Sequence, residues 1–402
     1  VDGIQMGSST GQLIDTFDVE SIEINRGPQG VLFGKNTIGG NIVVNRVKPQ
    51  FNDFGINASA ELGNFETESF KVRVNIPLIE DTLALKFGVI SRERDGYYDN
   101  HNIGGTAGDV DFQSWTAALR WAPADNFEAI MTFDNIDDTS QIPPQDPRYD
   151  GSNPFVTQAD KREPTIYDVD QLGIQATWDI SESITLYSNT GWHDGHDKVN
   201  QDFDGGGREG LAALFGQLHT LRDQQFETFT QELRLHGSFG ENVDYMMGFY
   251  YYDSDLDFNQ KTNNVLQLAL GFDAIGLPCG AIGFADHETV GNALCVLPNS
   301  KSTQLSFSKS ESTSVFGSIT WRPIEKLELM VGLRQIDEET EAGTSYFDHG
   351  TGTFDPANAA TEHDFTGLPS VPGNNYVSED DWDDTIWTGS VLYSITEIGR
   401  AS

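Results

Sequence analysis

The chain of 402 residues lacks long hydrophobic runs, has few basic residues and contains only two cysteines. A transmembrane helix needs about 20 consecutive apolar residues, and no such run occurs. The 24 lysines and arginines stand against 62 acids, a net charge of −38, which argues against nucleic-acid binding. Cys279 and Cys295 are too few for a disulfide scaffold and have no zinc-site spacing around them. The acidic excess indicates either a solvated surface or loops that attract cations.

Polar and apolar residues alternate with a period of two along most of the chain. The alternation is clear over residues 70–76, 115–121, 172–178, 229–235 and 327–333. Successive side chains of a β-strand point to opposite faces, whereas residues i and i+2 of a helix lie on different faces, so the pattern predicts strands. About twelve such segments occur, and each reaches the roughly 9–11 residues with which a tilted strand crosses a bilayer.

The connections between these segments alternate in length. Short turns are expected at Ile79–Thr82, Pro123–Asn126, Ser181–Ser183, Gly240–Val243 and Pro323–Lys326, and long polar loops at roughly 139–165, 198–224, 258–307 and 337–382. Membrane barrels have tight turns at one end and long loops at the other, whereas a soluble sandwich has no reason to keep its long loops together. We therefore predict an all-β membrane barrel, present as about twelve antiparallel strands over residues 51–402 and beginning with a strand at about 54–63.

The alternation also predicts which side chains face lipid and which face the lumen of the barrel. The residues expected to point outward are Val72, Val74, Leu119, Leu233, Leu329 and Val331. Those expected to point into the lumen are Lys71, Arg73, Arg120, Glu232, Arg234 and Arg334.

Residues 1–50 differ from the rest of the chain, because they are rich in glycine and carry only short apolar runs. They are typical of a small α/β or mostly β unit with tight turns, which glycine permits. A phosphate-binding glycine loop would need a Gly-Lys-Ser/Thr sequence between a strand and a helix, and neither is present.

The run DVESIEINRGPQGVLFGKNTIGGNI, residues 18–42, resembles the closing part of the plug domain of TonB-dependent receptors. The run FTQELRL, residues 229–235, resembles a barrel-strand signature of the same family. The resemblance implies that residues 1–50 are the C-terminal part of a plug, and that residues 51–402 are the N-terminal part of a barrel with long external loops. The family's barrel has 22 strands, so we expect this sequence to be incomplete, without the signal peptide, the TonB box and the C-terminal strands.

By resemblance, the complete protein takes up a scarce nutrient across the bacterial outer membrane without covalent chemistry or a cofactor. The expected partners are the TonB energy-coupling protein, which binds a segment missing here by strand addition, outer-membrane lipid, and a ligand. A ferric siderophore is the first choice, because it is the family's commonest cargo. An oligosaccharide, cobalamin or a plant aromatic is the alternative, and a passive porin, which would have no plug, or a soluble adhesive β-protein is less favoured.

Three groups of residues are singled out as sites. Met6 to Gln12 resembles a plug apical loop, so Ser8, Ser9, Thr10 and Gln12, with loop aromatics Tyr346 and Phe347, are expected ligand contacts; a plain connecting turn is the alternative. Since plug arginines pair with barrel carboxylates in the family, Arg26 is expected to contact Glu232 or to share a network with Arg234, unless it only caps a plug turn.

Cys279 and Cys295 are expected to form a disulfide, because their long loop should be external and meet an oxidising environment. A metal pair with His287 and two unpaired thiols are the alternatives.

No enzyme motif stands out. The stretch His193-Asp194-Gly195-His196 offers possible metal or acid/base groups, but no third ligand is placed near it in the sequence. The adjacent acids at 137–138 and 380–381 are expected to be solvated loop residues. We therefore predict a binding and transport protein.

Overall fold

The computed structural model describes residues 1–5, 15–27, 29–34, 37, 39–144, 153–159, 165–202, 217–265, 300–348 and 375–394. These residues form three sheets, of which one contains twelve strands. No helix within the described ranges has the length and apolar character needed to span a membrane.

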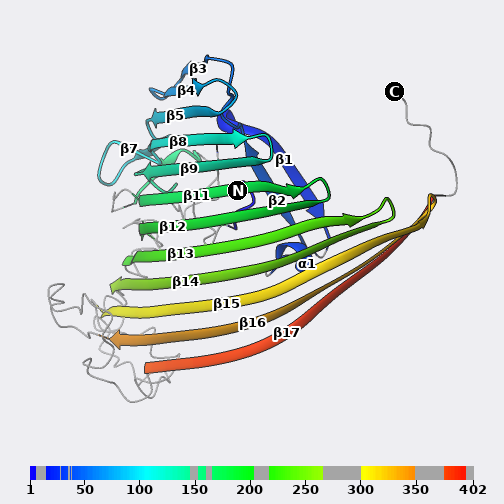
Figure 1. Cartoon of the computed structure of the whole chain (residues 1–402). Coiled ribbons are helices and arrows are strands. Elements are labelled where there is room, and N and C mark those ends of the chain that lie inside the picture. The colour runs from blue at the N-terminus through cyan, green and yellow to red at the C-terminus, as the bar shows by residue number, and fades with distance from the viewer. Residues whose placement is uncertain are drawn as a thin grey trace.

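The large sheet is antiparallel throughout and joins strands that follow one another in the chain, apart from short strands inserted in loops (Figure 1). Its strands are β3 (Gly55–Leu62), β4 (Glu68–Ile79), β5 (Leu83–Arg94), β8 (Val110–Ala124), β9 (Phe127–Asp138), β11 (Ile166–Ser181), β12 (Ile184–Asp202), β13 (Gln217–Phe239), β14 (Val243–Val265), β15 (Ser300–Ile324), β16 (Leu327–Asp348) and β17 (Asn375–Tyr393). The count of about twelve strands and the first strand at about 54–63 are confirmed.

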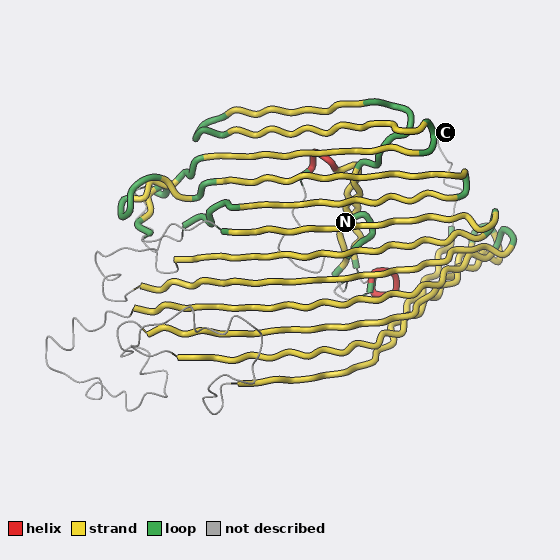
Figure 2. Tube along the Cα trace, turned by 60° about the vertical axis from the view of Figure 1, so that its left-hand side comes forward, coloured by secondary structure: helices red, strands yellow, loops and turns green. Residues whose placement is uncertain are grey.

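All five predicted short turns are confirmed, since each lies between two paired strands at the same end of the sheet (Figure 2). Three of the predicted long loops begin too early and end too late. β12 continues to Asp202, β14 to Val265 and β16 to Asp348, and the strands that follow begin at Gln217, Ser300 and Asn375. These strand ends consist mostly of polar residues, so the alternation is weak there, but their backbones still pair. The predicted loop 139–165 agrees with the gap between β9 and β11.

The N-terminal unit lies against the concave face of the large sheet (Figure 1). It consists of a 3-10 turn η1 (Thr16–Asp18), strand β1 (Val19–Arg26), the short helix α1 (Gly30–Phe33) and strand β2 (Gly40–Arg46), which pairs with β1. Gly40 joins this hairpin with φ +128°, and a Cβ there would lie 2.1 Å from the Asn25 carbonyl oxygen. Only glycine fits this position.

The two faces of the large sheet differ in polarity, as the alternation predicts. Val72, Leu233 and Val331 are exposed on the convex face, Val331 at 67%. Lys71, Arg73, Arg120 and Arg334 point to the concave face, where each contacts a residue of the N-terminal 49. Many buried residues are therefore polar, while large apolar residues are exposed, which is the arrangement of a barrel that faces lipid outside and a filled lumen inside.

A third sheet of three short strands caps one end of the molecule. It joins β6 (Tyr98–Asn100) and β7 (Thr106–Ala107), from the connection between β5 and β8, to β10 (Val156–Thr157), from the connection between β9 and β11. Asn100 is buried and donates a hydrogen bond to the Ala159 carbonyl oxygen at 2.9 Å, which ties the two connections together. The connection at 95–109 was absent from the predicted long loops.

Candidate functional site

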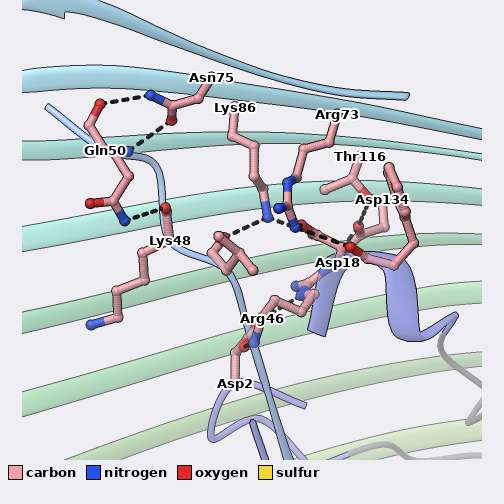
Figure 3. A network of polar contacts seen from close by, with 12 residues as sticks. Asp2, Asp18, Arg46, Lys48, Gln50, Arg73, Asn75, Lys86, Thr116 and Asp134 are labelled. Carbon is pink, nitrogen blue, oxygen red and sulfur yellow. Dashed lines mark hydrogen bonds and ion pairs between the residues drawn. The ribbon is translucent and has the colours of Figure 1, made fainter. Parts of the chain in front are cut away.

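The contact between the N-terminal unit and the large sheet is the most elaborate polar site among the described residues (Figure 3). At its centre is Asp18, the last residue of η1. Its carboxylate accepts hydrogen bonds from Lys86 of β5 at 2.5 Å and from Arg73 of β4 at 3.3 Å. The Lys86 side chain is 3% exposed and also donates to the Val47 carbonyl oxygen at 2.7 Å. A buried ammonium group therefore depends on this one carboxylate.

Asp15 forms the second contact, one turn earlier. It caps η1 by accepting the Phe17 backbone N–H at 2.9 Å, and its other oxygen accepts from Lys71 of β4 and Arg92 of β5, each at 2.7 Å. Burial alone would raise the pKa of Asp15, but the hydrogen bonds from Lys71 and Phe17, with the charges of Lys71 and Arg92, lower its pKa overall. The carboxylate is thus held in its charged form.

Arg46, the last residue of β2, forms the third contact. Here the charges are reversed, because the N-terminal unit supplies the cation and the sheet supplies the carboxylate. Nη1 of Arg46 donates to both carboxylate oxygens of Asp134 on β9, at 2.6 and 2.7 Å, and its Nε donates to Asp2 at 2.5 Å. Thr116 of β8 also donates to Asp134 at 2.5 Å. Burial would lower the pKa of Arg46, but Asp134 and Asp2 raise its pKa overall.

Helix α1 makes a fourth, less ionic contact with β15, β16 and β17. The Arg334 guanidinium of β16 donates to the Val31 carbonyl oxygen at 3.4 Å and lies over the rings of Phe316 and Tyr250. Gly34 follows α1 with φ +73°, and a Cβ there would lie 2.9 Å from an Arg334 nitrogen. The Gly34 backbone and the Arg334 guanidinium therefore approach more closely than a side chain at position 34 would allow.

The predicted contact of Arg26 with Glu232 is not formed among the described residues. Arg26 is exposed at the end of β1, and its carbonyl oxygen accepts a 3.5 Å hydrogen bond from Gln29. Glu232 pairs with Arg234 two residues along the same strand, at 2.7 Å. The unit and the sheet are joined by ion pairs, as expected, but through Asp15, Asp18 and Arg46 in place of Arg26.

Sequence reasoning missed those three residues because their partners are remote in the chain. Asp18 and Lys86 are 68 residues apart, and Arg46 and Asp134 are 88 apart. The available signal was the lumen-facing row Lys71, Arg73 and Lys86, which is basic in a strongly acidic chain and therefore calls for acidic partners.

Several predicted site residues lie outside the described residues. These are Ser8, Ser9, Thr10, Gln12, Cys279 and Cys295. Tyr346 and Phe347 were predicted as loop residues, but they belong to strand β16, where they pair with Gln304 and Thr303 of β15. These two residues were predicted in a loop for the same reason that the strands were predicted too short. Mostly polar sequence continues the sheet beyond its alternating part.

The two histidines at 193 and 196 do not form a metal site. They are three residues apart on β12 and therefore point to opposite faces of the sheet. His193 is buried on the concave side, and His196 contacts Asp223 at 2.8 Å. No group of three or more histidine, cysteine or acidic side chains suited to a metal ion occurs among the residues that the structure describes.

Comparison with known proteins agrees with this geometry. The TonB-dependent receptor plug domain family matches residues 1–41. The catecholate siderophore receptor Fiu of Escherichia coli K12 is 33% identical over 93 residues, which are 23% of this chain and 12% of Fiu.

Solved structures share the fold at low identity. The ferric yersiniabactin uptake receptor FyuA of Yersinia pestis has a TM-score of 0.65 at 17% identity, covering 94% of this chain and 50% of FyuA. The siderophore receptor PiuA of Acinetobacter baumannii has a TM-score of 0.68 at 15% identity, covering 97% of this chain and 54% of PiuA. The chain thus spans about half the length of these receptors.

Residues 1–41 are therefore similar to the plug domain of TonB-dependent receptors. The chain as a whole, with its curved twelve-stranded sheet, shares the fold of solved siderophore receptors.

Proposed function

We propose that the receptor containing this chain takes up a ferric siderophore across the bacterial outer membrane, driven by the TonB energy-coupling protein. The proposal is supported by the ion pairs that hold the plug on the concave face of the sheet. We call this set of ion pairs, made by Asp15, Asp18 and Arg46, the plug seat. A plug held by Asp15, Asp18 and Arg46 blocks the lumen at rest, so passage requires that these contacts be broken. A passive pore would have no use for such a seat.

Uptake of iron-labelled chelates tests the function. A strain that lacks the receptor should fail to accumulate iron from its chelate, and the cloned receptor should restore accumulation. An uncoupler of the inner-membrane potential should abolish the restored uptake, because TonB action depends on that energy. Uptake that survives the uncoupler would indicate a passive porin, and restored uptake of a non-iron ligand alone would favour the alternative cargo.

The outer-membrane location is part of the same proposal. It is supported by the apolar convex face, for example at Val315 and Val331. A fluorophore attached through cysteine at Val331, in a background with Cys279→Ser and Cys295→Ser, should be quenched by brominated lipids. The same label at Glu339, outward and eight residues farther along β16, should be quenched by a water-soluble agent. Equal quenching at both positions would contradict a membrane boundary between them.

We further propose the plug boundary near residue 50, with ligand contacts at Ser8, Ser9, Thr10 and Gln12 and a disulfide between Cys279 and Cys295. The boundary is supported by the gap between β2, which ends at Arg46, and β3, which begins at Gly55. Alanine at the four plug positions should weaken ligand binding. Labelling of the unreduced protein should find no reactive thiol, and two labelled thiols would rule the disulfide out.

A further inference from the structure

Strand β15 presents an uncharged hydroxyl surface to the lumen. Its inward positions above the plug are, in order, Ser306, Ser308, Ser310, Ser312 and Ser314, which we call the serine row. The inward direction is fixed by Phe316, the next residue of the same parity, because its ring lies against Arg334, which contacts the plug. Neighbouring strands extend the surface with Ser254 of β14 and with Thr340 and Thr344 of β16.

The base of the serine row contains a hydroxyl that has no hydrogen-bond partner among the described residues. Ser314 is 2% exposed, and its Oγ neither donates a hydrogen bond to, nor accepts one from, any residue in that part of the chain. Higher in the row, Ser306 donates to Thr344 at 3.0 Å and Ser310 donates to Glu338 at 3.2 Å. A buried polar group without a partner is costly, so Ser314 indicates a place where a ligand or water supplies the missing hydrogen bond.

The cations of the same wall are already neutralised or covered. Arg222 pairs with Asp197 at 2.7 Å, and Arg234 pairs with Glu232 at 2.7 Å. The Arg334 side chain is 3% exposed beneath aromatic rings. A ligand above the plug would therefore contact hydroxyl groups. The three arginines would attract an anionic ligand only weakly, because two are paired with carboxylates and the third is buried.

Carboxylates add to the negative character of this part of the lumen. Asp380 and Asp384 of β17 have the same parity as Ile386, which contacts α1, so they lie on the inward row of the sheet. Glu338 of β16 lies on the same face.

We propose that the ligand is an electrically neutral or cationic ferric chelate of the hydroxamate class. Three singly charged hydroxamate groups neutralise Fe³⁺ and expose carbonyl oxygens that serine hydroxyls can bind. Three doubly charged catecholate groups would leave a trianion, which the acidic wall repels. This inference rests on the proposed uptake of a ferric siderophore and specifies its chemistry.

Binding of two ferric chelates of similar size to the receptor in outer-membrane vesicles tests the charge class. A neutral trihydroxamate complex should bind at least about tenfold more tightly than a tris-catecholate trianion, because like charges in one site disfavour association. Its affinity should change little between low and high salt. Tighter binding of the trianion overturns this inference and leaves the proposed function standing, whereas failure to bind either chelate overturns both.

Paired variants locate the effect in the lumen. Asp380→Asn with Asp384→Asn should raise trianion affinity by roughly threefold or more, whereas the outward pair Asp381→Asn with Asp383→Asn should not. Ser310→Ala with Ser312→Ala should lower trihydroxamate affinity, and Thr313→Ala on the outward face of β15 should leave it unchanged. Heat-resistant migration on gels checks that each variant is folded. Equal effects of the inward and outward pairs would overturn the assignment.

Discussion

At the scale of single residues, the Asp18–Lys86 pair is the contact on which the seat of the plug depends most. Lys86 is almost fully buried, so removing the Asp18 carboxylate leaves its ammonium group with the Val47 carbonyl oxygen as its one hydrogen-bond acceptor among the described residues. Asp18→Asn should therefore destabilise the plug against the sheet by about 3–5 kcal/mol, the usual cost of breaking a buried pair on one side. Thermal unfolding of the detergent-solubilised receptor measures the loss.

A matched control for Asp18 lies in an exposed ion pair of the large sheet. Asp244 pairs with Arg322 at 2.5 Å, but both side chains are largely exposed. Asp244→Asn should change stability by less than about 1 kcal/mol, because exposed pairs contribute little. Equal losses in the two variants would show that burial of Lys86 does not decide the effect.

Asp15 makes the plug seat sensitive to acid. Its pKa lies below the ordinary value of 3.8 because Lys71, Arg92 and the Phe17 N–H stabilise the charged form. A lowered folded-state pKa contributes stability that is fully present above pH 4 and is lost as pH falls through the folded value. Between pH 5 and pH 2, the wild type should lose more stability than Asp15→Asn, as measured by denaturant midpoints. Parallel curves for the two proteins would refute the assignment.

At the scale of elements, the sequence predicted the strands with lipid on one face and could not predict where they end. β4, β5 and β8 have clear alternation along most of their length because one face is apolar. The outer parts of β13 to β16 consist mostly of polar residues, so their weak alternation predicts loops. Tyr346 and Phe347 were misplaced for this reason. The plug contacts were missed for a different reason. The register and curvature of the sheet bring Lys86 to Asp18, and no local sequence pattern predicts that approach.

The β1–β2 hairpin depends on one glycine. Gly40 has φ +128°, and a Cβ there would overlap the Asn25 carbonyl oxygen at 2.1 Å. Gly40→Ala should destabilise the hairpin by at least about 1–3 kcal/mol from backbone strain alone. Gly39→Ala is the matched control, because a Cβ at Gly39 meets nothing within 4 Å. The protease sensitivity of the plug measures the effect of each substitution. It should increase in Gly40→Ala and stay unchanged in Gly39→Ala.

At the scale of the whole molecule, the charge of −38 has an ordered component on the convex face. On every strand of the large sheet after β3, the outward-facing residues are apolar along the middle of the strand. Toward the end of the sheet that carries the long connections, they give way to a carboxylate. These carboxylates belong to Glu68, Glu93, Asp111, Asp137, Asp170, Asp194, Glu227, Asp253, Glu311, Asp337 and Asp383. The row marks the upper limit of the apolar band, where a membrane surface would lie. The same acids keep this polar part of the sheet in water.

The acidic row also places like charges directly opposite one another. Glu93 is the register partner of Glu68, Asp194 of Asp170, and Glu311 of Asp253. Side chains of such partners lie about 5 Å apart, and like charges there destabilise a sheet. The sheet therefore folds against a repulsion that depends on the ions around it, and the buried pairs of the plug seat are shielded from those ions.

Salt should consequently stabilise the receptor. The screening length falls from about 30 Å at 0.01 M salt to about 3 Å at 1 M, which is shorter than the spacing of the opposed carboxylates. The unfolding midpoint in detergent should rise over this range. Glu311→Gln should weaken the dependence because it removes the charge facing Asp253, whereas Thr313→Val on the same outward row should leave it unchanged. A midpoint that falls with salt would mean that attraction between ion pairs outweighs the repulsion along the acidic row.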